Sequence, residues 1–389
     1  MKPSFSEKIK NEKLALIVLI IALIIFVGMF VHLHPKTDDS ITADDYVEYE
    51  KGTVTAVLSD NLVQDPASDN GWRGEQMLTV KVTSGQYKGE EMLVYNYVGP
   101  LYGVPVYEGD GVTLSISTRP GGNHEATVFE YNRIPFLAII VLVFFAVIII
   151  IGRKTGFYSL LGLVFTILCL FAILIPLLLR GAPTIPTTFL MSAYIALVSF
   201  TLLGGIHRKT ISAFLGTTAG TALAMIFGLA SQALTRVSGL RMSNVEPLLQ
   251  LRQTTEAPIG LQGLLVAGII ISALGAVMDV AMSISSSLEE VHSANPELTA
   301  RRLFRSGMNI GRDMVGTMTN TLILAFLGSG FTLIIYLHSL GLSFYQLFSS
   351  AYASIEVISG VSSSIGMILA IPLTALISSA LLAGDKGNK

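Results

Sequence analysis

Long apolar segments recur along this chain and restrict it to the folds that a membrane allows. Stretches of about 18 apolar residues or more can cross the roughly 30 Å hydrocarbon core of a bilayer as helices. Such stretches occupy residues 14–31, 134–152, 157–179, 187–204, 211–231, 263–284, 318–338 and 355–383. Only 13% of the residues are charged, about half the usual share in soluble proteins. The predicted fold class is an α-helical polytopic membrane protein with about eight transmembrane helices.

Basic residues predict how these helices are oriented. Arg153-Lys154, Arg208-Lys209 and the arginines of the loop near 285–316 follow every second span, together with the N-terminal lysines. Cytoplasmic loops are enriched in lysine and arginine, so the N-terminus is expected to be cytoplasmic. No small-residue cleavage pattern follows the first apolar stretch, which favours an uncleaved anchor over a signal peptide. Residues 343–382 leave two alternatives open: one broken span preceded by a re-entrant piece, or two spans.

Residues 36–133 have a different character and divide the chain into three parts. Short runs with alternating apolar and polar residues, separated by glycine and proline, indicate about five strands. They predict a small OB-like or SH3-like barrel outside the membrane. The predicted parts are a tail and anchor at 1–35, this extracytoplasmic β-rich domain at 36–133, and a multi-span core at 134–389. The barrel is expected to serve interaction, gating or simple structural capping.

A local repeat marks two of the apolar segments. Residues 279–287 have the sequence DVAMSISSS and residues 356–364 have EVISGVSSS. Each copy places a carboxylate, Asp279 or Glu356, in an apolar setting and follows it with three serines. A charge at the centre of a membrane helix costs at least about 2.5–3.5 kcal/mol on insertion scales, and such charges are rare and functional. The repeat therefore predicts that function centres on these two positions.

Helical geometry places each carboxylate in a stripe of polar residues, because residues three or four positions apart share a face of a helix. The predicted stripes are Asp279, Ser283, Ser286 and Glu290; Asp313, Thr317 and Asn320; and Glu356, Ser359 and Ser363. Oxygen-rich stripes suit a hard cation or a proton relay, and helices broken at membrane depth commonly form transporter sites. The alternatives are ordinary packing by small residues and an ion pair between Asp313 and Arg312 or Arg305. Glu289 and Glu290 are expected to lie in water beyond the span.

Two further segments carry structural predictions. Gly216 and Gly220 lie four residues apart in an apolar segment, which is typical of close helix packing in membranes. Asn295-Pro296-Glu297 predicts the start of a short basic helix, because it supplies an N-cap, a proline at the first helical position and an acid near the dipole. This helix is expected to lie on anionic lipid or to contact a cytoplasmic partner.

Several classes of function are excluded by what the sequence lacks. The single cysteine, Cys169, excludes an internal disulfide and a cysteine-based zinc site. His32, His34 and His124 are too scattered to predict a metal site. No nucleotide-binding signature is present, and the near-neutral net charge of -2 does not predict a nucleic-acid partner. The chain is not expected to be an enzyme or to need a cofactor. A bound cation is the open alternative.

Two motif stretches are similar to a known family. The sequence AVMDVAMSI at residues 276–284 and the sequence IGRDMVGTMTNT at residues 310–321 resemble the YibE/F-like family of bacterial multi-span membrane proteins. The resemblance covers roughly residues 46–382. It implies a bacterial plasma membrane, and it adds no substrate, reaction or functional residue.

The leading functional prediction is a transporter or permease, coupled to a cation or a proton through the intramembrane carboxylates. Its partners would be the lipid bilayer, an unidentified small solute or ion, and a membrane or cytoplasmic protein. The alternative is a membrane scaffold, receptor or complex subunit that transports nothing and acts through its external β domain. Lipid-embedded carboxylates motivate the first prediction, and the size of the external domain motivates the second.

Overall fold

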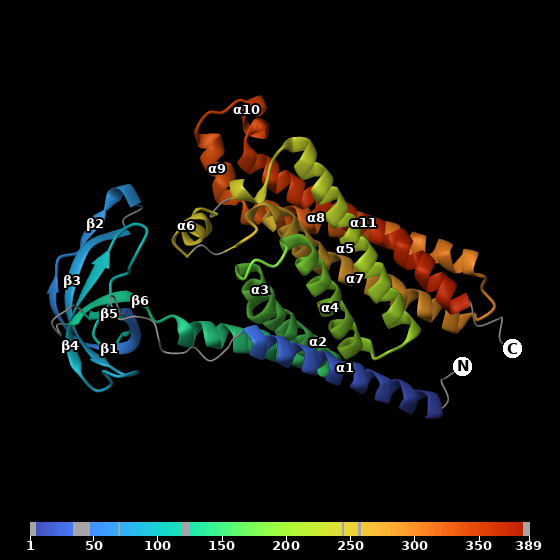
Figure 1. Cartoon of the computed structure of the whole chain (residues 1–389), viewed down its shortest axis with the longest axis horizontal. Helices are drawn as coiled ribbons and strands as arrows, with labels where there is room; N and C mark the ends of the chain where they lie inside the picture. Colours follow the sequence, from blue (N-terminus) through green and yellow to red (C-terminus); the bar gives the residue numbers. More distant parts are fainter. Residues whose placement is uncertain are drawn as a thin grey trace. The chain divides into compact units, whose positions relative to one another are not determined.

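The chain folds into two compact units, a β domain and a helical bundle. The computed structural model describes residues 5–33, 47–68, 71–118, 124–242, 245–255 and 258–383. The β unit spans Lys36–Ile148, and the bundle combines Met1–Pro35 with Ile149–Lys389. Figure 1 shows the β domain in light blue to teal, and the bundle combines the N-terminal helix in dark blue with later helices in green to red. The β unit ends at residue 148, further along the chain than the boundary predicted at residue 133.

The β domain is a small barrel. Its strands are β1 (Val47–Asp60), β2 (Val63–Asp65), β3 (Gly71–Val82), β4 (Glu91–Val98), β5 (Gly111–Thr118) and β6 (His124–Tyr131). They lie in the order β1-β5-β6-β4-β3-β2, and an additional pairing of β1 with β3 closes five of them into a barrel. Most pairs are antiparallel, whereas β4 and β6 run parallel. The predicted five-stranded barrel is confirmed, with β2 as a short added strand.

Alternating side chains fill the barrel and one polar group organises its interior. Leu78, Val80 and Val82 of β3 point inward and are buried. On the same face, the buried Gln76 side chain accepts a hydrogen bond from the Val106 backbone N–H at 3.1 Å and donates to the Val106 carbonyl at 3.2 Å. A buried amide is costly unless it is paired in this way. Gln76 thereby holds the β4–β5 connection against the barrel.

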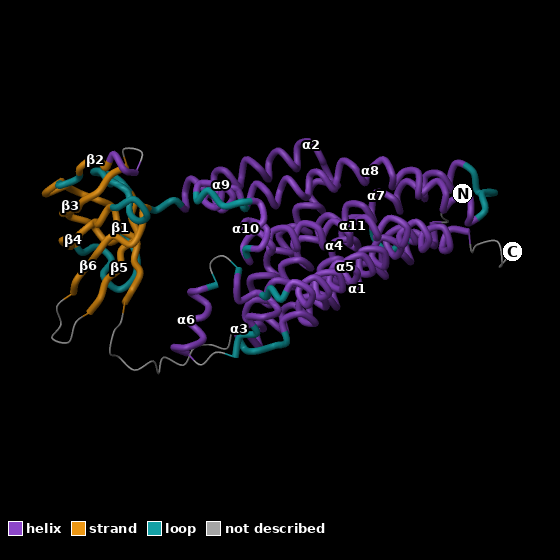
Figure 2. Tube along the Cα trace, turned by 90° about the horizontal axis from the view of Figure 1, so that it is seen from above, coloured by secondary structure: helices purple, strands orange, loops and turns teal. Residues whose placement is uncertain are grey.

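The bundle is built from long helices, drawn in purple in Figure 2. They are α1 (Phe5–Leu33), α2 (Ile134–Cys169), α3 (Ile175–Leu179), α4 (Thr184–Gly204), α5 (Arg208–Thr235), α6 (Glu246–Thr255), α7 (Leu264–Ala294), α8 (Ala300–Ser329), α9 (Phe331–Ser339), α10 (Phe344–Ser349) and α11 (Ala351–Ala383). A π-helical turn at Leu170–Leu174 joins α2 to α3. These lengths and compositions identify a multi-span membrane protein.

The apolar helices of the structure can be compared with the eight predicted spans. Six helices of the described chain are long and apolar enough to span a bilayer, and a seventh follows if α8 and α9, bent by 61° at Gly330, count as one span. The predicted spans 134–152 and 157–179 lie in one helical run of 46 residues, Ile134–Leu179. That run is broken at Arg153, whose φ of 49° and ψ of -129° are not helical. The break coincides with the predicted loop at Arg153-Lys154.

Helices α5 and α11 meet along a seam of small residues. Ala370 faces Gly220, where an added Cβ would lie 2.7 Å from the Ala370 Cβ. An added Cβ at Gly366 would lie 2.5 Å from the Ala224 Cβ. Only small side chains allow two helices to approach this closely. The predicted packing role of Gly216 and Gly220 is confirmed, since both glycines lie in this seam. We call these two contact zones, together with Gly216 against Thr374, the α5–α11 seam.

Helix α11 is a single uninterrupted span. It runs from Ala351 to Ala383 through Gly360 and Pro372 without a break. Arg208, at the start of α5, donates a hydrogen bond to the Leu381 carbonyl at 3.1 Å. The end of α11 therefore lies at the α5 N-terminus, and of the two alternatives for residues 343–382 the structure has one span. The short α10 precedes it, but the predicted interruption near the serines is wrong.

Candidate functional site

Asp279 lies in the middle of α7 and faces away from the bundle. Its neighbours Val277, Val280 and Ala281 are buried in the core, whereas Asp279 is exposed. Within the described part of the chain, its carboxylate makes no hydrogen bond and no ion pair. An unpaired carboxylate in an apolar helix is the costly arrangement that the sequence predicts. The structure adds that this group points outward rather than into the bundle.

The residues around Asp279 form an outward strip on α7. Gly275 and Ser283, one turn before and after it, are also exposed. An added Cβ at Gly275 would meet no atom within 4 Å. Ser286 is half-buried and Glu290 is exposed. The stripe predicted from helical spacing is therefore present on α7, on the surface of the monomer.

Helix α8 carries a second outward strip. Asp313, Thr317 and Asn320 are all exposed, as the predicted stripe requires. The opposite face, through Gly307 and Gly311, packs against α11, where an added Cβ at Gly307 would lie 2.9 Å from the Ala375 Cβ. Asp313 forms no ion pair with Arg312 or Arg305 in the described chain, so the structure does not show the ion-pair alternative.

The two strips lie on neighbouring antiparallel helices. An added Cβ at Gly307 of α8 would lie 3.0 Å from Leu288 Cδ1 of α7, which sets the register between the two helices. Because the two helices are antiparallel, a step back along α7 matches a step forward along α8. Asp279 lies nine residues before Leu288 and Gly316 lies nine residues after Gly307, so these two residues are at the same level. We call the exposed residues of this hairpin the outer polar face. It consists of Gly275, Asp279, Ser283, Asn309, Arg312, Asp313, Gly316, Thr317 and Asn320.

Glu356 occupies a different place, beside the bend between α8 and α9. An added Cβ at Gly330, the residue at the bend, would lie 3.5 Å from the Glu356 Cδ and Cγ atoms. Glu356 and Ser359 are half-buried, and no hydrogen bond or ion pair of Glu356 is found among the described residues. The helix break that the sequence predicts at the carboxylates is instead at Gly330, since α7 and α11 are continuous.

Asp279 and Glu356 lie at different depths. Ser272 of α7 and Ser363 of α11 form a hydrogen bond of 2.9 Å, and Ser285 and Ser378 form one of 3.1 Å. These pairs show that α7 and α11 run parallel, with offsets of 91 and 93 residues (363 - 272 and 378 - 285). Glu356 therefore aligns with residue 263–265, 14–16 residues from Asp279, which is about 21–24 Å along a helix. The repeat does not place its two carboxylates together.

The remaining predicted residues have structural partners or lie at the surface. Ser363 is fully buried and bonds to α7 rather than lining a site. Glu289 forms an ion pair with Lys209 at 3.0 Å, which ties α7 to the start of α5. The pairing of Ser285 with Ser378 was not predicted, because nothing in a single sequence shows which partner a serine on the buried face of an apolar helix has. Only the parallel packing of α7 and α11 shows that these serines are partners.

Two cavities of the bundle lie elsewhere. A pocket of about 660 Å³ is lined by Thr184, Gln232, Arg252 and the loop at residues 258–263. A second, apolar pocket of about 280 Å³ includes Leu174, Thr188 and Gly268. Neither pocket is lined by Asp279, Asp313 or Glu356. In the isolated chain, the polar groups of α7 and α8 are thus on an open surface rather than in these cavities.

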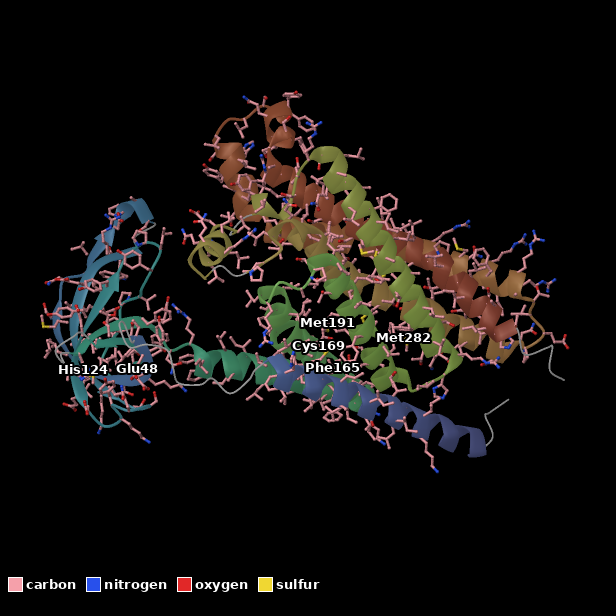
Figure 3. The ribbon with its side chains drawn as sticks, viewed as in Figure 1. Glu48, His124, Phe165, Cys169, Met191 and Met282 are labelled. Atoms are coloured by element: carbon pink, nitrogen blue, oxygen red, sulfur yellow. The ribbon has the colours of Figure 1, made fainter. Side chains whose placement is uncertain are left out.

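Cys169 lies in the interior of the bundle. Figure 3 shows it beside Met191 and Phe165, and its thiol is fully buried. The cluster around it is apolar, with Ile173, Ile195 and Phe200 among its buried members. The surroundings of this thiol are therefore those of a packing residue.

Comparison with known proteins adds one finding. A family model described as YibE/F-like protein matches residues 140–384, which is 245 of the 389 residues. No curated protein and no solved structure matches the chain. The matched region covers the multi-span core and both motif stretches. It begins after the last strand of the β domain, so the wider resemblance predicted from residue 46 is supported only for the core.

Proposed function

The chain belongs to the YibE/F-like family, and we propose that it is a transporter or permease of the bacterial plasma membrane, coupled to a cation or a proton. The observation that carries this proposal is the outer polar face, where Asp279, Asp313 and Asn320 of a membrane protein have no hydrogen-bond or ion-pair partner among the described residues. Each ionised group placed in hydrocarbon costs at least about 2.5–3.5 kcal/mol on insertion scales, and such groups usually mark ion or proton paths.

The residues of the outer polar face would have distinct roles. Asp279 lies at the middle of α7 and is proposed to bind the cation or carry the proton. Thr317 and Asn320 supply neutral oxygens near its level, of the kind that complete the shell of a hard cation. Asp313 and Arg312 lie closer to the N-terminus of α8 and would control access from that side. Glu356 is proposed to act separately, at the bend between α8 and α9.

The proposed orientation has the N-terminus in the cytoplasm and the β domain outside. Tyr194 of α4 donates a hydrogen bond to the Ala22 carbonyl of α1, and Arg180 donates one to the Leu33 carbonyl at 2.7 Å. Helix α1 therefore runs antiparallel to α4 and begins near the start of α5. Figure 1 shows the first turns of α1 and the last turns of α11 at the same end of the bundle. Arg208-Lys209 lies at this end, which the positive-inside rule assigns to the cytoplasm.

Ion flux into proteoliposomes tests the transport proposal. The purified protein is reconstituted, and a panel of cations and a proton gradient are applied with an internal reporter dye. We expect wild-type flux for at least one ion and a loss of about tenfold or more in Asp279→Asn, since a neutral amide cannot balance the ion's charge. Glu290→Gln, on the same helix but beyond the apolar stretch, serves as the control and should retain flux. Equal flux in wild type, Asp279→Asn and empty vesicles would rule the proposal out.

A second candidate function rests on the β domain. Its surface exposes large apolar and aromatic side chains in the β4–β5 region, with Leu101 96% exposed and Tyr102 63% exposed. Exposed apolar patches of this kind mark protein or membrane contacts. The alternative is therefore a scaffold, receptor or complex subunit that acts through this patch. It predicts that Leu101→Asp/Tyr102→Ser abolishes the cellular function while Asp279→Asn preserves it, which a complementation assay separates.

A further inference from the structure

We infer that the outer polar face is covered by a second copy of this chain, so that α7 and α8 of two protomers meet across a two-fold axis. The interface itself does not depend on the chain being a transporter. It follows from where the polar side chains of α7 and α8 lie and from what a bilayer can solvate.

A lipid-facing position would leave these groups without partners. Asp279 and Asn320 lie within the apolar stretches at residues 263–284 and 318–338, both are exposed, and neither forms a hydrogen bond or an ion pair in the described chain. Hydrocarbon offers no hydrogen-bond or ion-pair partner, and polar groups in membrane helices normally face protein or a water-filled cavity. Thr317 differs, because its hydroxyl donates to the Met314 carbonyl at 3.2 Å. Asp279 and Asn320 therefore require another polar surface beside α7 and α8.

The start of α2 and the helices α4 and α5 offer no such surface among the described residues. Residues 134–152, at the start of α2, contain no polar side chain, and large apolar residues such as Ile140 and Leu142 are exposed there. Polar residues of α4 and α5, among them Ser192 and Thr221, are buried inside the bundle. A second copy of α7 and α8 supplies a polar surface at the matching depth.

Charge on α8 makes this face self-complementary. Arg312 and Asp313 are adjacent in sequence and therefore lie at nearly the same depth, and both are exposed. A two-fold axis along the membrane normal brings a face against its own copy, so residue i meets residue j and j meets i. Arg312 of each protomer then faces Asp313 of the other. Gly275 and Gly316 have open space beside them, which lets the helices of two copies approach closely.

This arrangement deepens the proposed function, on which the following consequence rests. Two Asp279 carboxylates, at the level of Gly316, would approach each other across the axis. Together with Ser283 and Asn320 of both copies they would form an oxygen-lined site for a hard cation or a shared proton. The polar path would then lie between protomers, which accounts for carboxylates that line neither of the two pockets described in the monomer.

Cysteine cross-linking in native membranes tests the interface. In a Cys169→Ala background, single cysteines replace Gly316 and Thr317 on the outer polar face. Leu190→Cys on α4 is the matched control, because Leu190 is an exposed apolar residue at membrane depth. Gly316→Cys and Thr317→Cys should shift most of the chain to the mass of a dimer upon oxidation, and Leu190→Cys should remain monomeric. Because the Gly316 site is open, Gly316→Cys is expected to fold.

The charge pair gives a second readout. Arg312→Asp and Asp313→Arg should each weaken the dimer, because they oppose like charges across the axis. The double exchange Arg312→Asp/Asp313→Arg should restore it. Absence of cross-links at both outer positions, an adduct of a mass other than twice the chain, or a single chain per particle by native mass spectrometry in nanodiscs would overturn the inference. Cross-linked dimers without ion flux would retain the interface and reject the transport proposal instead.

Discussion

The α5–α11 seam and the outer polar face use small and polar residues in opposite ways. In the seam, Gly220, Gly366 and their neighbours let two helices touch, and every added atom would collide. On the outer polar face, Gly275 and Gly316 have open space beside them. The same residue type thus marks a completed contact in one region and an uncovered surface in the other. The comparison shows that glycine and serine in a membrane helix do not indicate by themselves which role they have.

The comparison also separates hydroxyls from carboxylates. The serines between α7 and α11 are paired with one another, which satisfies them inside the bundle. Asp279 and Asp313 have no such partner in the described chain and lie on its surface. Helix packing accounts for these serines. In contrast, no interaction in the described chain shows how Asp279 and Asp313 would stabilise the monomer. Substitutions in the two regions should therefore differ in sign as well as in size.

The largest effect is expected in the seam. Gly366→Leu forces a branched side chain into a position where even a Cβ would lie 2.5 Å from the Ala224 Cβ. Overpacking costs typically about 1–3 kcal/mol and more where the backbone cannot move. We expect a loss near the upper end of that range, measured by thermal unfolding in detergent. Gly275→Leu is the matched control, and a comparable loss there would contradict the difference between the two regions.

An opposite sign is expected at Asp279. Asp279→Leu removes an unpaired carboxylate and adds an apolar side chain that lipid or detergent can solvate. On insertion scales, leucine and aspartate at the centre of a membrane helix differ by about 3 kcal/mol. The unfolding free energy of the detergent-solubilised protein should stay constant or rise by up to that amount. A drop in the stability of the detergent-solubilised monomer would show that Asp279 has a structural partner within its own chain and would contradict this prediction.

The smallest effect is expected for the serine pairs. Ser272→Ala with Ser363→Ala, and Ser285→Ala with Ser378→Ala, form two double-mutant cycles between α7 and α11. Hydrogen bonds between membrane helices contribute about 0.6 kcal/mol on average. Each cycle should give a coupling energy of that order by chemical denaturation in mixed micelles. Coupling between Ser272 and Ser378, which are not partners, provides the reference and should be close to zero.

Much of the architecture could be predicted from sequence because it depends on local pattern. Apolar length identifies the spanning segments, and strict alternation identifies the strands of the barrel. The polar stripe of Asp313, Thr317 and Asn320 follows from helical spacing alone. Continuity of α7 and α11 could not be predicted, since serine and glycine weaken an isolated helix, while packing in the bundle keeps both helices intact. The relevant break lies at Gly330, where the sequence has no proline.

By itself, the sequence determined that this protein is a membrane protein with a separate β domain and carboxylates in apolar helices. These properties depend on residues close together in the chain, where solvation and helical period decide. Tertiary structure alone decided which way those carboxylates face and that Asp279 and Glu356 lie about 21–24 Å apart in depth. The reason is that the register between α7 and α11 is set by contacts such as Ser272 with Ser363, 91 residues apart. A repeated motif fixes the local surroundings of a residue, whereas helix packing decides its depth and its neighbours.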